Sequence, residues 1–294
     1  MIFKGDDFVN RYRLEGELCA LTPTHIGTGE TRSEKRPKSK EDKQEQETQE
    51  IAVIARDFKG LPYLPGSALR GVVRHYLLQV FRSFKHRLAD DPNFEHEKFR
   101  DLDQQQQITY MKNEASLLEQ LFGTPFSESK VEFWDSPALN KVEALPDCVE
   151  KGWDKNGQSY VVRSVAINPE TGAAEAHKLY AFEVAPPGLR YHVNIVGQNL
   201  TAEELGFLLF GLHGFSSEIF SLTLGAMAGR GFGRMCFELK NLYRVERADL
   251  KNWINLAAAS NHAGYKMLPK VEGAIEPLVK PFKDSFHERM RRLP

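Results

Sequence analysis

The sequence predicts an α+β protein in which helices pack on a mostly antiparallel sheet. Two observations predict this fold class. Segments with the two-residue alternation of strands and segments with the three- and four-residue spacing of helices follow one another in the order strand, helix, several strands, helix, strand. In addition, 41% of the 294 residues are hydrophobic and 27% are charged, which is typical of a globular protein.

The first part of the chain predicts two strands, a charged segment between them and a helix. Residues 11–21 alternate between polar and apolar side chains, as a half-buried strand would. Residues 31–50 mix cations with anions and contain no aliphatic or aromatic side chain, so we expect a mobile loop inserted into the domain. The apolar run at 51–55 resumes the sheet. An amphipathic helix follows over residues 68–84, for which Ser67 is the expected cap.

The remainder of the chain predicts a second insertion, two helices and several strands. Residues 86–107 are charged and rich in glutamine, which favours a poorly packed insertion, and a short helix is expected over 108–121. Residues 201–220 combine a capping box with an apolar stripe and predict a second core helix. We expect one domain over residues 1–245 and an irregular C-terminal extension over 246–294. Strands are expected at 130–136, 159–168, 178–184, 190–197 and 235–239.

Charge, cysteines and hydropathy restrict the class of protein. The net charge is −1, so affinity for nucleic acid must come from local clusters of cations. Cys19, Cys148 and Cys236 form no CxxC pair, and we expect buried free thiols in a reducing cytoplasm. The start of the chain has no apolar signal segment and no stretch approaches a membrane span, so we expect a cytoplasmic protein without a membrane partner.

Two segments place glycine backbone beside arginine, at residues 65–71 and 225–234. Glycine lets the backbone approach a ligand closely, and arginine can pair with phosphate through two hydrogen bonds, so both are candidate phosphate sites. The alternatives are a capped helix start for the first segment and a tight turn for the second. The second segment is followed by a strand and not by a helix, which excludes a dinucleotide-binding turn, and no GxxxxGK[ST] motif occurs.

These motifs, together with others in the same order, resemble the RAMP superfamily (repeat-associated mysterious proteins) of type III CRISPR effector complexes. The resemblance extends over about residues 11–240. It rests on five segments, which are residues 21–29, 55–71, 121–136, 162–184 and 229–234.

The resemblance implies a ferredoxin-like, RRM-related core with charged loop insertions and a β-hairpin thumb. It also implies a structural subunit that holds the phosphates of a guide RNA (crRNA) and the guide–target duplex, with target RNA and other type III subunits as partners and no cofactor for binding. For each candidate arginine the alternative is a solvated or salt-bridged surface cation. The candidate RNA-binding residues are His25, Gly27, Arg56, Ser67, Arg70, Arg74, Arg163, Asn168, Gly229, Arg230, Gly231 and Arg234.

Catalysis has weaker support in the sequence. The aspartate of cleaving RAMP proteins would fall at Ile51, where only Glu50 and, further off, Asp42 and Glu47 offer a carboxylate for Mg²⁺ or another divalent ion. His25 is a candidate general base, and the alternative is that it orders its loop. No spacing of histidine and cysteine indicates a resident metal. We therefore favour a non-cleaving subunit. A metal-dependent endoribonuclease that cleaves target RNA or processes guide RNA, and a protein-contact subunit at the end of the filament, are the alternatives.

Overall fold

The structure is a computed structural model that describes residues 3–35, 48–82, 88, 99–124, 127–145, 152–168, 170–172, 174–259 and 268–292. Helices and mainly antiparallel sheets are both present, which confirms the α+β prediction. The ferredoxin-like topology that the resemblance implies, and the domain division at residue 245, stay predictions.

A four-stranded antiparallel sheet forms the centre of the molecule, in the order β10-β1-β9-β5. Along β1 every second side chain is buried, including Leu14 and Leu18, while those between them are half-buried on the other face. The predicted strand alternation is therefore confirmed for β1. The four strands are β1 (Asn10–Ala20), β5 (Val131–Phe133), β9 (Arg190–Gln198) and β10 (Met235–Glu246).

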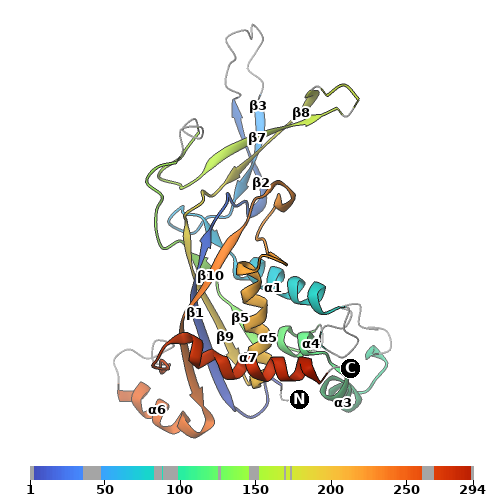
Figure 1. Cartoon of the computed structure of the whole chain (residues 1–294), viewed down its shortest axis with the longest axis vertical. Helices are drawn as coiled ribbons and strands as arrows, with labels where there is room; N and C mark the ends of the chain where they lie inside the picture. The colour runs from blue at the N-terminus through green and yellow to red at the C-terminus, as the bar shows by residue number, and fades with distance from the viewer. Residues whose placement is uncertain are drawn as a thin grey trace.

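Helices cover the apolar face of this sheet (Figure 1). Side chains of α1 and α5 join those of β1 in one core, and Phe81, Phe207 and Phe286 from three different helices meet with ring centres 5.3–5.7 Å apart. Gly206 lets α5 approach α7, because a side chain there would clash with the backbone of Phe282. The helices are α1 (Gly66–Phe81), α4 (Leu117–Phe122), α5 (Ala202–His213) and α7 (Ile275–Arg291).

A second sheet, in the order β2-β3-β8-β7, rises beyond the helices at the upper end of Figure 1. Its central pair β3 and β8 is parallel, and the outer pairs are antiparallel. The expectation of a loop over residues 31–50 is wrong at both ends of that range, which belong to β2 and β3; residues 36–47 lie outside the described residues. The strands are β2 (Gly27–Lys35), β3 (Thr48–Ile54), β7 (Tyr160–Ile167) and β8 (Ala174–Val184); β4 (Tyr63–Leu64) and β6 (Ser136–Pro137) form a separate pair.

The remaining elements differ from the predicted ones in three places. Part of the expected insertion at 86–107 is helical, because Asp103 and Gln106 form a capping box that starts α3 (Gln104–Glu114). The helix expected over 201–220 ends at His213 and continues as the 3₁₀ turn η2 (Gly214–Ser216). The segment after 245 contains η4 (Arg247–Asp249), α6 (Leu250–Ala259) and α7, not the irregular extension that the sequence predicts, because α7 has an apolar face that joins the main core.

Candidate nucleic-acid interface

The first backbone amide of α1 is hydrogen-bonded to a side chain from another segment. Pro65 is the N-cap residue, and it provides no side-chain hydrogen bond. The amide of Gly66 instead donates to Oδ1 of Asp135 at 2.8 Å, and a side chain on Gly66 would clash with the carbonyl oxygen of Phe133. A carboxylate therefore lies where an anion would bind, which supports the alternative of a packed helix start. Ser67 is exposed and is not the cap, contrary to the prediction.

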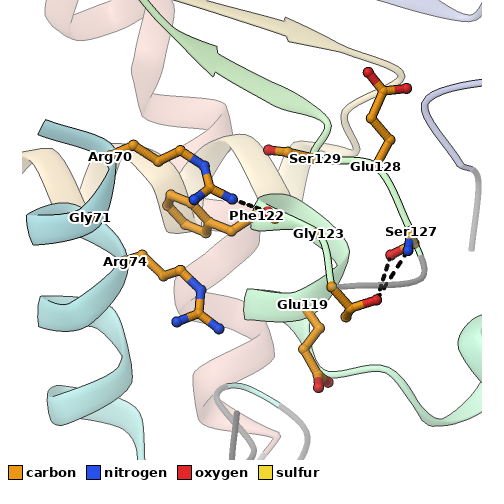
Figure 2. A pocket seen from close by; sticks show the side chains of 10 residues that line it. Arg70, Gly71, Arg74, Glu119, Phe122, Gly123, Ser127, Glu128 and Ser129 are labelled. Atoms are coloured by element: carbon orange, nitrogen blue, oxygen red, sulfur yellow. Dashed lines mark hydrogen bonds between the residues drawn. The ribbon is translucent and has the colours of Figure 1, made fainter. Parts of the chain in front are cut away.

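Arg70 and Arg74 lie one turn apart on α1 and point into a cavity of about 530 Å³ (Figure 2). The opposite wall is formed by α4 and residues 123–124 and 127–129. Arg70 donates to the backbone carbonyl of Phe122, and its guanidinium carbon lies 5.7 Å from the centre of the Phe122 ring. Burial lowers the pKa of Arg70, and the charge of Arg74 lowers it further. The Arg70 guanidinium nevertheless remains protonated at neutral pH.

The carboxylates that line this cavity are already engaged elsewhere. Glu119 is 4% exposed, and its Oε2 accepts from the amide of Ser116 at 2.8 Å in a capping box. Glu128 forms an ion pair with Lys4 at 2.7 Å. Within the described part of the chain, neither Arg70 nor Arg74 forms an ion pair. The cavity is therefore lined by two arginines and two carboxylates, and the two guanidinium groups, which have no carboxylate partner among the described residues, are available to pair with a phosphate group.

The glycine-rich segment 225–234 forms a loop beside the second sheet. Gly233 has a φ of +76°, and a side chain there would clash with the carbonyl oxygen of Leu224. Arg230, in the 3₁₀ turn η3 (Ala228–Arg230), lies with its guanidinium carbon 4.9 Å from the centre of the Tyr180 ring. Arg234 is exposed, and its amide donates to the Thr22 hydroxyl. Gly229 and Gly231 are exposed, with open space around them.

Arg56, another candidate, is partly exposed and is held in place by the buried Glu183. Its two Nη atoms donate to Oε1 of Glu183 and the Ser159 hydroxyl, both at 2.7 Å, and to the carbonyl oxygens of Gly60 and Gly157. The Glu183 side chain is 2% exposed. Burial raises the pKa of Glu183, but hydrogen bonds from Ser159 and Arg56 outweigh that effect and hold it below its usual range. This arrangement supports the salt-bridged alternative for Arg56.

His25 is held by the same residue. Its Nδ1 lies 2.6 Å from the backbone carbonyl of Glu183, its side chain is buried, and its ring meets the Phe182 ring edge to face. These contacts support the alternative that His25 orders its loop. Gly27 follows at the exposed start of β2.

Sequence reasoning missed Glu183, although one signal was available. A single acidic residue lies within the apolar run 181–185. Charged side chains are rarely buried without a partner, so such a position predicts a buried ion pair. The partner, 127 residues away, has no sequence signal.

The other candidates lie apart from the cavity. Arg163 on β7 forms an ion pair with Glu34 of β2, in which Nη2 of Arg163 lies 3.7 Å from Oε2 of Glu34. Asn168 forms a turn, because its Oδ1 accepts from the amides of the residues at 170 and 171. Glu50 is exposed on β3, next to the buried Ile51. Asp42 lies outside the described residues.

The described residues contain neither a metal-binding cluster nor a helix that could cross a membrane. Three or more histidine, cysteine or carboxylate side chains nowhere cluster in a way that could hold a metal ion within the described ranges. Among the helices of that same part, none has the length and apolar character needed to cross a membrane.

Comparison with known proteins places the chain in a family. The model of the RAMP superfamily matches residues 17–237, which is most of the chain and includes both the Arg70–Arg74 cavity and the glycine-rich loop. In a search of curated proteins, none matched the chain. The chain therefore belongs to the RAMP superfamily, a membership that indicates a CRISPR-associated, RNA-binding subunit.

Proposed function

We propose that this protein is a structural subunit of a type III CRISPR complex, in which it holds the phosphates of the guide RNA and supports the guide–target duplex. The observation that carries this proposal is the cavity with Arg70 and Arg74. Two cations converge there without a carboxylate partner among the described residues, and family membership makes RNA the expected ligand.

The chemistry of the cavity suits a backbone phosphate. The aromatic ring and backbone carbonyl of Phe122 orient the guanidinium of Arg70, so less conformational entropy is lost when phosphate binds. Among the described residues, none restrains Arg74 in this way, and Arg74 supplies a second charge one helical turn away. Contacts of this kind bind RNA of any sequence, while pairing between guide and target reads the sequence.

The glycine-rich loop provides a second point of contact. Arg230 and Arg234 are exposed, and the Arg230 guanidinium makes a cation–π contact with the Tyr180 ring. The sheet β2-β3-β8-β7 projects away from the helices (Figure 1), which suits the thumb that RAMP proteins insert between guide and target.

Salt dependence of RNA binding tests the proposal. Arg74→Gln removes a charge that no described residue needs, and we expect it to weaken binding of a labelled guide RNA. It should also make the slope of log K against log salt less steep by about 0.7, the value for one lost phosphate contact on a single strand. Arg247→Gln is the matched control, because Arg247 is 69% exposed and lies in η4, outside the cavity. Its slope should equal that of the unchanged protein.

Other outcomes identify the competing functions. Equal slopes for Arg74→Gln and the control would contradict the role of the cavity. Weak binding with almost no salt dependence would favour a protein-contact subunit. Cleavage of target or guide RNA that requires Mg²⁺ and is lost in Glu50→Ala or Asp42→Ala would establish the endoribonuclease instead.

A further inference from the structure

Two of the three cysteines lie opposite each other on neighbouring strands. In the antiparallel ladder of β1 and β10, Cys19 pairs directly with Cys236, and residues paired in this way project from the same face of a sheet. Cys19 is half-buried and Cys236 is exposed. The expectation of a buried thiol is therefore wrong for Cys236, because it lies on the face that the helices leave uncovered. Cys148 is outside the described residues.

The type of strand pair fixes the approximate separation. The amide of Ala20 donates to the Leu189 carbonyl, on the side of β9, so the amide of Cys19 points towards β10. Cys19 and Cys236 therefore form a hydrogen-bonded pair, whose Cα atoms lie about 5.5 Å apart. That separation matches the most common Cα distance of disulfides, about 5.5–6 Å.

The Cβ atoms of Cys19 and Cys236 must move closer together before a disulfide can form. The Cβ atoms of such a pair are up to about 5.5 Å apart, whereas a disulfide brings them to about 3.8 Å. The two strands must approach each other locally, so the bond would be strained. Strained disulfides are reduced more easily than relaxed ones, which is typical of reversible bonds.

We propose that Cys19 and Cys236 form a reversible intrachain disulfide when a low-molecular-weight disulfide such as oxidised glutathione is present. The exposed Cys236 thiolate attacks one sulfur of the small disulfide, forms a mixed disulfide and releases one thiolate. The Cys19 thiolate then attacks Sγ of Cys236 and releases the second. The two cysteines lose two protons and two electrons, and the small disulfide gains them as two thiols.

The surroundings of the two thiols are consistent with this order of steps. Sγ of Cys236 lies 3.6 Å from the Ser216 hydroxyl and is open to solvent, so it meets the small disulfide first. Burial and the neighbouring Cys236 raise the pKa of Cys19, which makes Cys19 the less reactive thiol towards an external reagent. Once Cys236 carries the mixed disulfide, the reaction of Cys19 is intramolecular and proceeds at high effective concentration.

The bond would fix the base of the glycine-rich loop. Cys236 is the second residue of β10 and follows Arg234 by two positions. A covalent link there joins the end of the loop to β1. The disulfide chemistry itself does not depend on the proposed RNA binding.

Peptide mapping of Cys148→Ser protein tests the proposal. The protein is incubated with oxidised glutathione, its free thiols are alkylated, and it is digested with trypsin without reduction. We expect loss of both thiols and a linked pair of peptides, 14–32 with 235–240. The product should remain a monomer on a non-reducing gel, and reduced glutathione should restore both thiols.

The matched control is Cys19→Ser in the same background. This variant should keep glutathione on Cys236, because no second thiol is present to displace it. The proposal is overturned if the protein with both cysteines also keeps glutathione on Cys236 while Cys19 stays free. It is equally overturned if Cys236 does not react, or if the linked peptides come from a dimer.

Discussion

The ion pair between Lys130 and Glu204 provides the sharpest test of the forces that hold the fold together. Their side chains are each 1% exposed, and Nζ of Lys130 lies 2.6 Å from Oε1 of Glu204. The second carboxylate oxygen accepts from the amide of Thr201 at 2.8 Å, where α5 begins. Lys130→Met removes the ammonium group but keeps most of its apolar stem, and the Glu204 carboxylate is then buried without a counter-ion.

The expected loss of stability follows from this burial. Removing one partner of a buried ion pair costs about 3–5 kcal/mol, which is a large part of the roughly 5–15 kcal/mol that stabilises a typical domain. Urea unfolding of the variant should therefore show a much lower midpoint with an unchanged m value. The double variant Lys130→Met/Glu204→Gln should regain part of the loss, because no isolated charge remains and the amide oxygen can still accept from Thr201.

An exposed pair on α7 is the matched control. Lys280 and Asp284 are four residues apart, and their side chains are 67% and 57% exposed. Lys280→Met should cost only about 0.3–0.5 kcal/mol, because water screens the pair. A loss below about 1 kcal/mol for Lys130→Met, or a double variant as unstable as the single one, would refute the reasoning.

Two further predictions concern a buried acid and a helix start. Hydrogen bonds from Ser159 and Arg56 hold the pKa of Glu183 below its unfolded value, so Glu183 contributes stability above about pH 4.3 that is lost as the pH falls through its lowered native pKa. Unfolding free energies measured against pH should fall less steeply in acid for Glu183→Gln than for the unchanged protein, and parallel curves would contradict this. In α1, Gly66→Ala should destabilise because its side chain would meet the backbone of β5, whereas Gly71→Ala has open space and should stabilise by about 0.5–1 kcal/mol. Equal melting temperatures for the two variants would show that the backbone of β5 does not lie close enough to Gly66 to exclude a side chain there.

Periodicity predicted the elements whose apolar side chains enter the core. The alternation along residues 11–21 corresponds to β1, and the apolar stripe from residue 68 corresponds to most of α1. The capping box at Thr201 and Glu204 is present at the start of α5. In each case one face of the element is buried, so the sequence carries the pattern of that face.

The elements that the sequence did not predict bury little or depend on distant partners. All nine residues of β2 are exposed, so its composition matches that of a loop, and backbone pairing with β3 makes it a strand. The last helix, α7, contains Pro281, which argues against a helix in the sequence. It forms nevertheless, because its apolar residues Val279 and Phe286 are buried in the main core.

The candidate site shows why local sequence does not reveal what an arginine can bind. Arg56 is followed by Asp57, but that carboxylate accepts from the amides of the residues at 59 and 61 and not from Arg56. Arg74 lies between Val73 and His75, without an adjacent acidic residue. Arg56 is paired with the carboxylate of Glu183, which lies on β8. That carboxylate reaches the guanidinium only once the second sheet has formed. Arg74 faces a cavity whose two carboxylates are held by other donors. A phosphate can therefore bind at Arg74 without breaking a native ion pair, whereas binding at Arg56 would require displacing a buried one, and the cost of isolating Glu183 would exceed the gain from a single phosphate contact.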